Sequence, residues 1–505
     1  MKLLSSTILV FLPLIAGVII ASPFFPNNEV KIRRTAKTFL VLEFLYSLFF
    51  LVFFNPDQTG YQFNESLNHF NGLTWVKALG CNISFGLDGI SLILVILTTF
   101  IVLMAGVASK SNINKQHKLY YTLLLILETA VLGVFTAKDL LLFVIFWEIE
   151  LIPMYLLILI WGTGRKDYSA MKFILFTFGG SIFMIASVIA LGLLHYLHTG
   201  VLTFDMQTLT AFKDYSHSII IQILIFLGLF IGFAVKLPIV PIHTWLPDAH
   251  VDAPTPISMI LAGILLKMGG YGLIRLNLQI LPDIFKLFAP IMIILGIINI
   301  IYAAFIAFAQ KDLKKLIAYS SISHMGIVLL GLGALNVSGI TGAVFQMVAH
   351  GIISAGLFMM VGVIYLRSHT REISKLSGLT DIMPRISYFS MIIIFASLGL
   401  PLLIGFAAEV LVFYGAFIST SFNLIQILTV VGIFGIILTA GYLLWTYQRV
   451  FCGNILPDLK KLHDVTPHEV FVFMSIIFVI IIFGIYPTGL TSIFEPAINN
   501  LLKVI

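Results

Sequence analysis

The stretch PISMILAGILLKMGGYGLIRL, at residues 256–276, is long and apolar enough to cross a lipid bilayer as one helix, yet it carries a lysine at its centre. Lys267 lies about eleven residues from either end, roughly 16 Å of helix rise, so its amine cannot easily extend along the helix to reach water. A charge at the middle of an isolated membrane helix costs about 3 kcal/mol on insertion scales. We therefore expect Lys267 to be a buried lysine that is either functional or paired inside the protein.

The composition of the whole chain agrees with this segment. Of 505 residues, 59% are hydrophobic and 10% are charged, and the mean hydropathy is +1.06. A soluble domain usually has about a quarter of its residues charged. The sequence therefore predicts an all-α polytopic membrane protein. The N-terminal run is long enough to span a bilayer, so we interpret it as the first helix rather than as a signal peptide.

The apolar runs predict the positions of about 14 transmembrane helices. They lie near residues 3–22, 36–54, 87–108, 119–137, 140–161, 170–194, 218–238, 253–276, 287–309, 313–334, 339–365, 386–418, 423–448 and 467–487. The longest predicted loops are 55–86, 195–217 and 449–466.

The basic residues predict how the chain is oriented. Most of the 29 lysines and arginines fall in loops that follow odd-numbered helices, and a smaller set that includes Lys2, Lys77 and Lys213 falls on the other face. The positive-inside rule places the richer face in the cytoplasm or stroma and both termini on the periplasmic or lumenal side. Because the basic residues are spread over many loops, we expect no nucleic-acid partner. Only Lys236 and Lys267 fall within apolar segments.

Lys236 lies where a predicted helix should break. The segment AVKLPIVPIHTWLPDAH, at 234–250, places Pro238 and Pro241 just after it, and proline removes a backbone donor and clashes with the preceding turn. Broken helices at membrane depth often line an ion or proton site. A lysine at a helix end that extends toward the membrane surface is an equally good explanation of this segment taken alone.

A second break is predicted in LPLLIGFAAE, at 400–409, where Pro401 and Gly405 weaken the helix ahead of Glu409. Predicted helices 4–8 and 9–13 form two consecutive groups of five. Each of the two breaks falls in the fourth helix of its group. Matching interruptions in two halves of a membrane protein indicate inverted repeats with a site at mid-membrane depth.

Glu148 and Glu150, in FWEIELIP at 146–153, add two carboxylates to an apolar run. Residues two apart on a helix point about 200° apart, so both cannot face one partner, and Trp147 and Pro153 do not decide between them. Further polar residues at depth are Glu43, Glu128, His324 and His350. Each single histidine is more often a hydrogen-bonded core residue than a ligand, and nothing fixes the axial geometry of a haem.

Several protonatable residues on separate helices favour a proton relay over a substrate cavity. Opposite charges ~6 Å apart attract by about 3 kcal/mol at an effective dielectric constant of ~20. A carboxylate moving toward Lys236 would keep the amine protonated, and one moving away would release the proton. The two cysteines, Cys81 and Cys452, lie too far apart to suggest a disulfide framework, and they exclude a cysteine-ligated iron–sulfur cluster within this chain.

The joint pattern of five motifs resembles the antiporter-like subunit M of bacterial NADH–quinone oxidoreductase, respiratory complex I. These motifs are FWEIELIPMYLLILIWG, AVKLPIVPIHTWLPDAH, APTPISMILAGILLKMGGYGLIR, DLKKLIAYSSISHMG and FQMVAHGIISAGLF. The resemblance covers about residues 85–450. The segment LLKMGGYGLIRLNLQILPD, together with IELIP shortly after Trp147, is most similar to the equivalent subunit, NdhD, of the cyanobacterial and plastid NAD(P)H–quinone oxidoreductase.

The resemblance implies a fold of fourteen helices with helices 7 and 12 broken. It implies N-terminal helices 1–3 over 1–118, inverted five-helix repeats over 119–280 and 285–450, and a C-terminal helix and tail over 451–505. It assigns Glu148 as the partner of Lys236, Lys267 as the central relay lysine and Glu409 as the terminal acid. His324 and His350 match histidines on the hydrophilic axis. The chain departs from the family's usual LPGxSGF, with Leu402 for Gly and Ile404 for Ser, so the resemblance does not fix the shape of the break in helix 12 or the detail of the exit path.

From this resemblance we expect a proton-translocating subunit of an NAD(P)H– or ferredoxin–quinone oxidoreductase in a bacterial inner or thylakoid membrane. We expect no metal and no cofactor in this chain, because quinone, iron–sulfur clusters and NAD(P)H or ferredoxin would bind to other subunits. The expected partners are the antiporter-like L and N homologues and the small K homologue. The alternatives are a subunit of a multisubunit cation/proton antiporter, a hydrogenase-linked complex, or a scaffold whose buried charges only specify helix packing.

Overall fold

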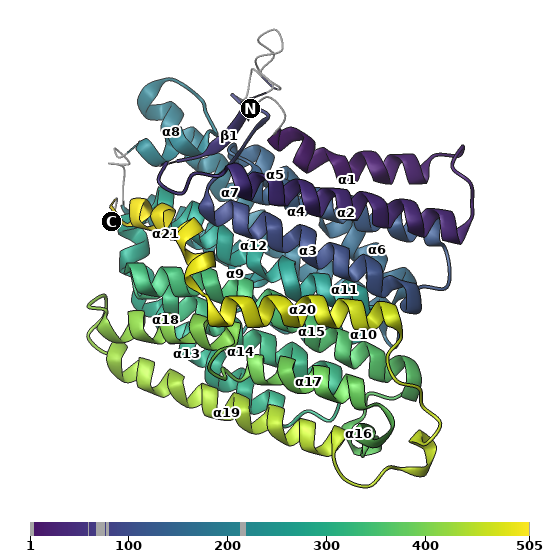
Figure 1. Cartoon of the computed structure of the whole chain (residues 1–505). Helices are drawn as coiled ribbons and strands as arrows, with labels where there is room; N and C mark the ends of the chain where they lie inside the picture. The colour runs from purple at the N-terminus through teal and green to yellow at the C-terminus, as the bar shows by residue number, and fades with distance from the viewer. Residues whose placement is uncertain (1–4, 59, 67–75, 77–79, 213–218, 504–505) are drawn as a thin grey trace.

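The chain folds into a bundle of helices that run along one common direction, as Figure 1 shows for the computed structural model. The structure describes residues 5–58, 60–66, 76, 80–212 and 219–503. Lys2, Lys77 and Lys213, which the sequence assigns to the less basic face, lie outside the described residues.

The first part of the chain forms α1 (Ser6–Ala21), α2 (Glu29–Phe53), α3 (Gly89–Asn112), α4 (His117–Thr136), α5 (Leu140–Ile149), α6 (Leu151–Trp161), α7 (Lys166–Thr199), α8 (Met206–Ala211), α9 (Ile219–Lys236) and α10 (Trp245–Asp252). One continuous segment then joins α11 (Thr255–Ile260), a π-helical stretch (Leu261–Leu265), α12 (Leu266–Gly272) and a second π-helical stretch (Leu273–Leu278). The remaining helices are α13 (Pro282–Phe308), α14 (Leu313–Gly333), α15 (Val337–Ser368), α16 (Leu379–Ile382), α17 (Pro384–Ser397), α18 (Ile404–Ile418), α19 (Ile425–Phe451), α20 (Pro467–Ile485) and α21 (Thr488–Leu502).

Within the described residues, 12 helical segments are long and apolar enough to cross a membrane. Two of these are composite, since Leu140–Trp161 joins α5 to α6 and Thr255–Leu278 runs from α11 through α12. The helices α1, α17 and α18 are apolar but shorter. The membrane class and the helical fold expected from the sequence are therefore confirmed, but the predicted run 386–418 is divided between α17 and α18, and α21 was not predicted as a helix.

Side-chain caps fix where several helices begin. Asp88 caps α3 and forms a reciprocal pair of hydrogen bonds with Ser91, while Asp139 and Asp312 accept bonds from the first backbone N–H groups of α5 and α14. Asn336 caps α15 in the same way. Such caps satisfy backbone donors that a helix cannot pair internally, which stabilises each helix start by about 1 kcal/mol.

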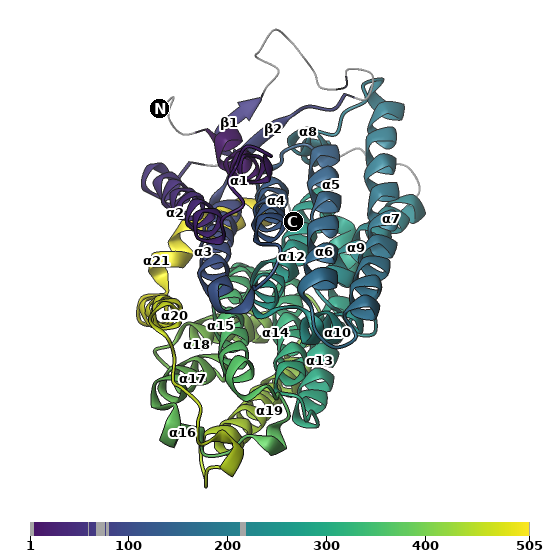
Figure 2. The same ribbon diagram turned by 90° about the vertical axis from the view of Figure 1, so that its right-hand side faces the viewer.

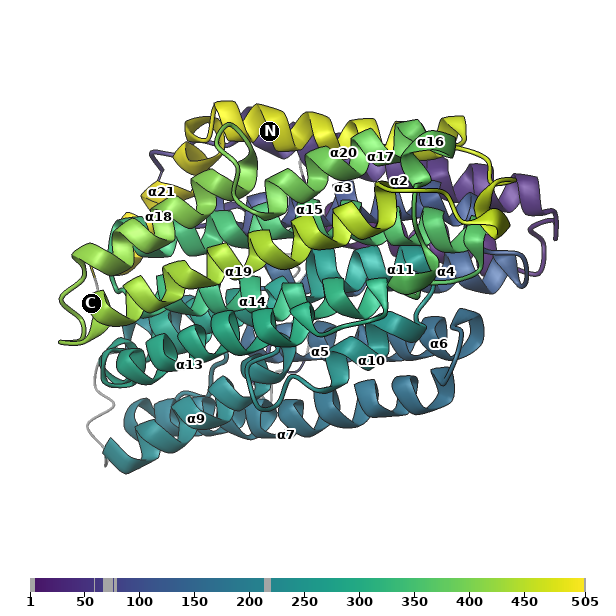
Figure 3. The same ribbon diagram turned by 90° about the horizontal axis from the view of Figure 1, so that it is seen from below.

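Four segments form the centre of the bundle: α3, the α11–α12 segment, α14 and α15, of which almost every residue is buried. Figures 2 and 3 show α7, α13, α19 and α20 lying outside these segments. The outer helices expose large apolar side chains, such as Leu175 on α7 and Phe434 on α19. An apolar outer surface of this extent fits a bilayer and not water.

A short antiparallel hairpin covers one end of the bundle. β1 (Gln62–Ser66) pairs with β2 (Ser84–Leu87), and Gln62 lies opposite Leu87. Both strands lie in or at the edge of residues 55–86, which the sequence predicts as a loop.

Candidate functional site: a buried polar chain through the bundle

Lys236 is the last residue of α9, and the chain stays non-helical until α10 begins at Trp245. Its amine forms a salt bridge with the Glu150 carboxylate, and both side chains are almost completely buried. The amine also lies over the Trp147 ring, 5.2 Å from its centroid, where the negative face of the indole adds attraction. Lys236 is therefore a charge held inside the protein and not one extended toward the membrane surface.

Glu148 lies next to this pair without contacting the amine directly. Its carboxylate interacts with the Ser181 side chain and, electrostatically, with Lys236. The run of helical hydrogen bonds is interrupted at Glu150, between α5 and α6, although the Glu150 backbone stays in the right-handed helical region. Pro153 lacks the N–H that would have bonded to the preceding turn, which accounts for the interruption. The resemblance assigned the lysine partner to Glu148, whereas the salt bridge in the structure is made by Glu150.

Lys267 lies in α12, between the two π-helical stretches, and its side chain is fully buried. The amine donates a hydrogen bond of 2.5 Å to the carbonyl oxygen of Ala262, and its Nζ lies 2.7 Å from Nδ1 of His350. π-Helical turns widen the backbone and often occur at functional sites. Here the widened turn presents a carbonyl to the lysine, and α15 provides the histidine.

A row of polar side chains continues from Lys267 across three further helices. The rings of His350 and His324 lie 5.7 Å apart between centroids, and Nδ1 of His324 is 3.6 Å from Oε1 of Glu409. Gln346 and Ser397 lie 3.4 Å and 3.3 Å from the two ring nitrogens of His324. Four residues predicted from the sequence, on α12, α15, α14 and α18, therefore form one continuous row.

A small cavity accompanies the end of this row. It is lined by His324, His350, Ser320, Ser354 and Glu409, and its water-accessible space is about 10 Å³. A space of this size, surrounded by polar groups, holds about one water molecule. One water molecule in this space would bridge His324 to Glu409 or to His350.

Glu409 is positioned by the second helix break. Residues 398–403, between α17 and α18, are non-helical and include Pro401, and both Gly399 and Leu402 have positive φ angles, of 75° and 72°. Gly399 faces the Glu409 carboxylate, and Gly405 packs so closely on the Ala396 carbonyl that a Cβ atom would collide with it. Gly405 is thus required by close packing as the α18 helix begins.

His250 belongs to this region, although the sequence reasoning missed it. It lies on α10, fully buried, with its ring stacked on Phe358 at 4.4 Å, and neither ring nitrogen has a hydrogen-bond partner among the described residues. It interacts electrostatically with Lys267 and His350. Its place in the interrupted segment that begins at Lys236 was the available signal.

The helices that carry the two lysines meet backbone to backbone. At Gly269, on α12, a Cβ atom would lie 2.7 Å from both the Leu237 nitrogen and the Phe233 oxygen at the end of α9. Only a glycine permits this approach. In the described part of the chain, no hydrogen bond or salt bridge joins Lys236 directly to Lys267.

Two further buried acids lie away from this row. Glu43 on α2 and Glu128 on α4 interact with each other electrostatically, and their carboxylate oxygens have no hydrogen-bond partner in the described structure. Across the described chain, no three His, Cys, Asp or Glu side chains are grouped to hold a metal ion. Cys81 and Cys452 are not bonded to each other, and burial raises the pKa of the Cys81 thiol to about 12.

Comparison with known proteins matches residues 137–437 to the family described as NADH:quinone oxidoreductase/Mrp antiporter, transmembrane. The chain is 41% identical to the chloroplastic NAD(P)H-quinone oxidoreductase chain 4 of Physcomitrium patens, over 98% of each chain. It is 40% identical to NADH-quinone oxidoreductase subunit M of Rhodobacter capsulatus, over 98% of this chain and 96% of that one.

Solved structures agree with the sequence comparisons. A chain of respiratory complex I from Thermus thermophilus superposes with a TM-score of 0.87 at 26% identity, covering 99% of both chains. A chain of the Mrp complex from Dietzia shares the fold, with a TM-score of 0.86 at 18% identity, over 98% of this chain and 97% of that one. The chain belongs to the family of antiporter-like membrane subunits found in NADH:quinone oxidoreductases and Mrp antiporters.

Proposed function

We propose that this chain is a proton-translocating subunit of an NAD(P)H– or ferredoxin–quinone oxidoreductase. The observation that carries this proposal is the buried row of Lys267, His350, His324 and Glu409. Lys267 lies 2.7 Å from His350, and a single water would bridge His324 to His350 or to Glu409. A substrate site would need a cavity large enough for a small molecule, roughly 300 Å³ or more, whereas the cavity in this row has about 10 Å³.

In this proposal Lys267 gives its proton to His350, which is 2.7 Å from the amine. The proton then passes through His324 and the neighbouring water-sized space to Glu409, at the α18 side of the bundle. Each step joins a donor to an acceptor in a site from which bulk water is largely excluded. Because the local dielectric constant is low, a charge on one group interacts strongly with the next group.

Lys236 and its two glutamates act as the loading switch of the relay. Opposite charges at about 4 Å attract by about 4 kcal/mol at an effective dielectric constant of 20. A carboxylate in contact with Lys236 keeps the amine protonated, and withdrawal of Glu150 removes that stabilisation and releases the proton toward Lys267. Quinone chemistry in neighbouring subunits supplies the energy for this movement, and this chain contributes no redox centre.

The proposal includes the organisation and surroundings of the subunit. Residues 119–280 and 285–450 are two inverted repeats, supported by the interruptions that follow Lys236 and Ser397. Both termini lie on the periplasmic or lumenal side, supported by the positions of the α1 start and α21 at one end of the bundle (Figure 1). Antiporter-like L and N homologues and a small K homologue are its neighbours in the membrane.

The relay is tested by Lys267→Ala in the intact complex. Proton pumping into membrane vesicles, measured by the quenching of a pH-sensitive dye, should fall at least tenfold. The amount of assembled complex should stay close to that of the wild type. Lys311→Ala, at an exposed lysine on the loop side, is the matched control and should pump normally. Normal pumping by an assembled Lys267→Ala complex would overturn the relay assignment.

The fold shared with the Mrp complex supports a second candidate function, as a subunit of a cation/proton antiporter. The two functions differ in what accompanies the chain. Co-purification with peripheral redox subunits supports the quinone oxidoreductase, and co-purification with small membrane proteins alone supports the antiporter. A hydrogenase-linked complex would be recognised by a metal-containing hydrogenase subunit in the same preparation.

A further inference from the structure

A basic hollow lies on the outer surface of α2, away from the relay. Arg33, Arg34 and Lys37 of α2 and Lys110 near the end of α3 surround a space of about 480 Å³. Arg33 is paired with Glu29 at 2.9 Å. Among the described residues, no carboxylate lies within 4 Å of the charged groups of the other three, so the hollow carries excess positive charge.

An apolar cavity lies further along the same helices. It has about 620 Å³ of accessible space, and α2, α3 and α20 contribute most of its walls, with α15 beneath and α21 closing the far end. Figures 1 and 2 show α2 and α20 on either side of α3. The principal lining residues are Phe44 and Leu48 of α2, Ile96 and Phe100 of α3, and Phe471 and Phe478 of α20.

The hollow and the cavity share one face of α2. Lining residues 34, 37, 41, 44, 48 and 51 are spaced alternately by three and four positions, which is the spacing of a single helical stripe. On α3, Ile96 and Lys110 are separated by about four helical turns and so lie on one face as well. From Lys37 to Leu51 the stripe is about 21 Å long, which exceeds half of the ~30 Å hydrocarbon core.

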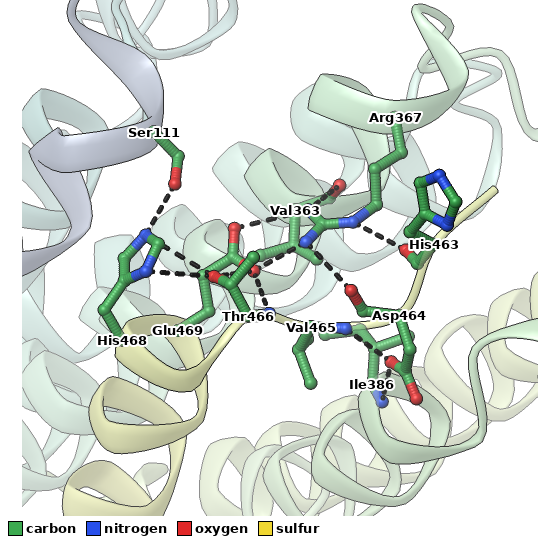
Figure 4. Close-up of polar contacts among 10 residues, drawn as sticks. All are labelled: Ser111, Val363, Arg367, Ile386, His463, Asp464, Val465, Thr466, His468 and Glu469. Carbon is green, nitrogen blue, oxygen red and sulfur yellow. Dashed lines mark hydrogen bonds and ion pairs between the residues drawn. The ribbon is translucent and has the colours of Figure 1, made fainter.

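The hollow and the cavity together form one groove, and its α20 wall is anchored to α3 and α15. Figure 4 shows the start of α20 bound to α3 through His468, whose Nε2 lies 2.6 Å from the Ser111 hydroxyl, and to α15 through Arg367, which donates to Glu469 at 2.6 Å. These contacts fix α20 at the level of Lys110. Polar contacts therefore anchor the start of α20 at the end of the groove nearest Lys110.

We propose that this groove binds one anionic lipid from the bilayer leaflet on the side of the basic loops. Its phosphate group lies between Arg34, Lys37 and Lys110, and an acyl chain runs along α2 into the apolar cavity. A small soluble anion would leave the cavity unused, and a neutral lipid would leave three positive charges uncompensated. Each basic residue at a membrane surface contributes about fivefold to binding of anionic lipid, so the three together contribute about a hundredfold.

The head-group part is tested with Arg34→Gln, Lys37→Gln and Lys110→Gln combined in the intact complex. Phosphatidylglycerol binding, measured by native mass spectrometry after delipidation in neutral detergent, should weaken about a hundredfold, and phosphatidylcholine binding should be little changed. The control combines Lys311→Gln, Lys460→Gln and Lys461→Gln, which removes the same charge from exposed lysines on the same side. Equal loss in both triple variants would show general surface attraction and would overturn the site.

The acyl-chain part is tested with Leu48→Trp, which fills the cavity, against Leu45→Trp, at an exposed position elsewhere on α2. Only Leu48→Trp should reduce the phosphatidylglycerol that co-purifies with the complex, by at least fivefold. Equal retention by the two variants would overturn the placement of the chain. Two results together would overturn the lipid proposal. The wild-type complex would retain no phosphatidylglycerol, and a Leu48→Cys variant would cross-link to a helix of a neighbouring subunit.

Discussion

The assignment of the salt-bridge partner of Lys236 gives the sharpest test of the site geometry. The structure places Glu150 in contact with the amine and Glu148 beyond direct contact. Replacing Glu150 with Gln leaves a buried ammonium group without its nearest counter-charge, whereas replacing Glu148 leaves the salt bridge intact. The two substitutions are isosteric, so they change charge while packing is preserved.

The expected magnitude follows from burial and separation. Removing one member of a buried ion pair typically costs 3–5 kcal/mol, and the direct attraction at ~4 Å is about 4 kcal/mol at an effective dielectric constant of 20. Glu148 remains near the amine and reduces the loss, so we expect about 3 kcal/mol for Glu150→Gln. Glu148 makes no salt bridge with the amine, so its attraction is weaker, and we expect at most about 2 kcal/mol for Glu148→Gln.

The assay is a double-mutant cycle with Lys236→Met, measured by denaturant unfolding of the purified chain in mixed micelles. The coupling free energy should be about 3 kcal/mol for Glu150 with Lys236 and clearly smaller for Glu148 with Lys236. Glu128→Gln is the control, because Glu128 is fully buried and forms no salt bridge in the described structure. Its coupling to Lys236 should be near zero. A larger coupling for Glu148 than for Glu150 would refute the geometric assignment.

Three further predictions concern other parts of the structure. His350→Phe should reduce proton pumping at least tenfold in the assembled complex, because it removes the acceptor 2.7 Å from Lys267; dye quenching in vesicles measures this, and unchanged pumping would contradict it. Gly269→Ala should destabilise the chain by about 1–3 kcal/mol in thermal unfolding, since a Cβ atom collides with α9; an unchanged melting temperature would contradict it. A membrane-impermeant maleimide should label the exposed Cys452 from the basic-loop side only. It should not label Cys81 even at pH 9, because the Cys81 thiol is buried and its pKa is raised to about 12. Rapid labelling of Cys81 would contradict this prediction.

The sequence predicts the membrane fold well because the cost of burying charge in lipid is large and local. Long apolar runs have few possible structures other than transmembrane helices, and each internal lysine is conspicuous against them. Lys236 was correctly located at a helix end, because Pro238 follows it and proline disrupts helices regardless of tertiary context. Lys267 was recognised from its depth alone, and the structure buries it completely.

The details that could not be predicted depend on contacts between distant segments. The spacing of Glu148 and Glu150 shows that they point in different directions, but which of them contacts Lys236 depends on how the helices pack against each other. His250 lies in the interrupted segment after Lys236, but its burial against Phe358 of α15 depends on how α10 packs, which the local sequence does not show. The β1–β2 hairpin was missed because its strands are short and lack a regular alternation of apolar and polar residues.

In the proposed relay, the polar groups from Lys236 to Glu409 are unevenly spaced. From Lys267 to Glu409 each group lies near the next, whereas Lys236 and Lys267 share no direct contact in the described chain. A row that was continuous throughout would let protons leak across the membrane without coupled chemistry. Because α9 and α12 meet at Gly269 without an intervening side chain, a small sliding movement between them changes the separation of the two lysines. In the proposed relay, this gap between the two lysines is the step at which proton transfer is controlled.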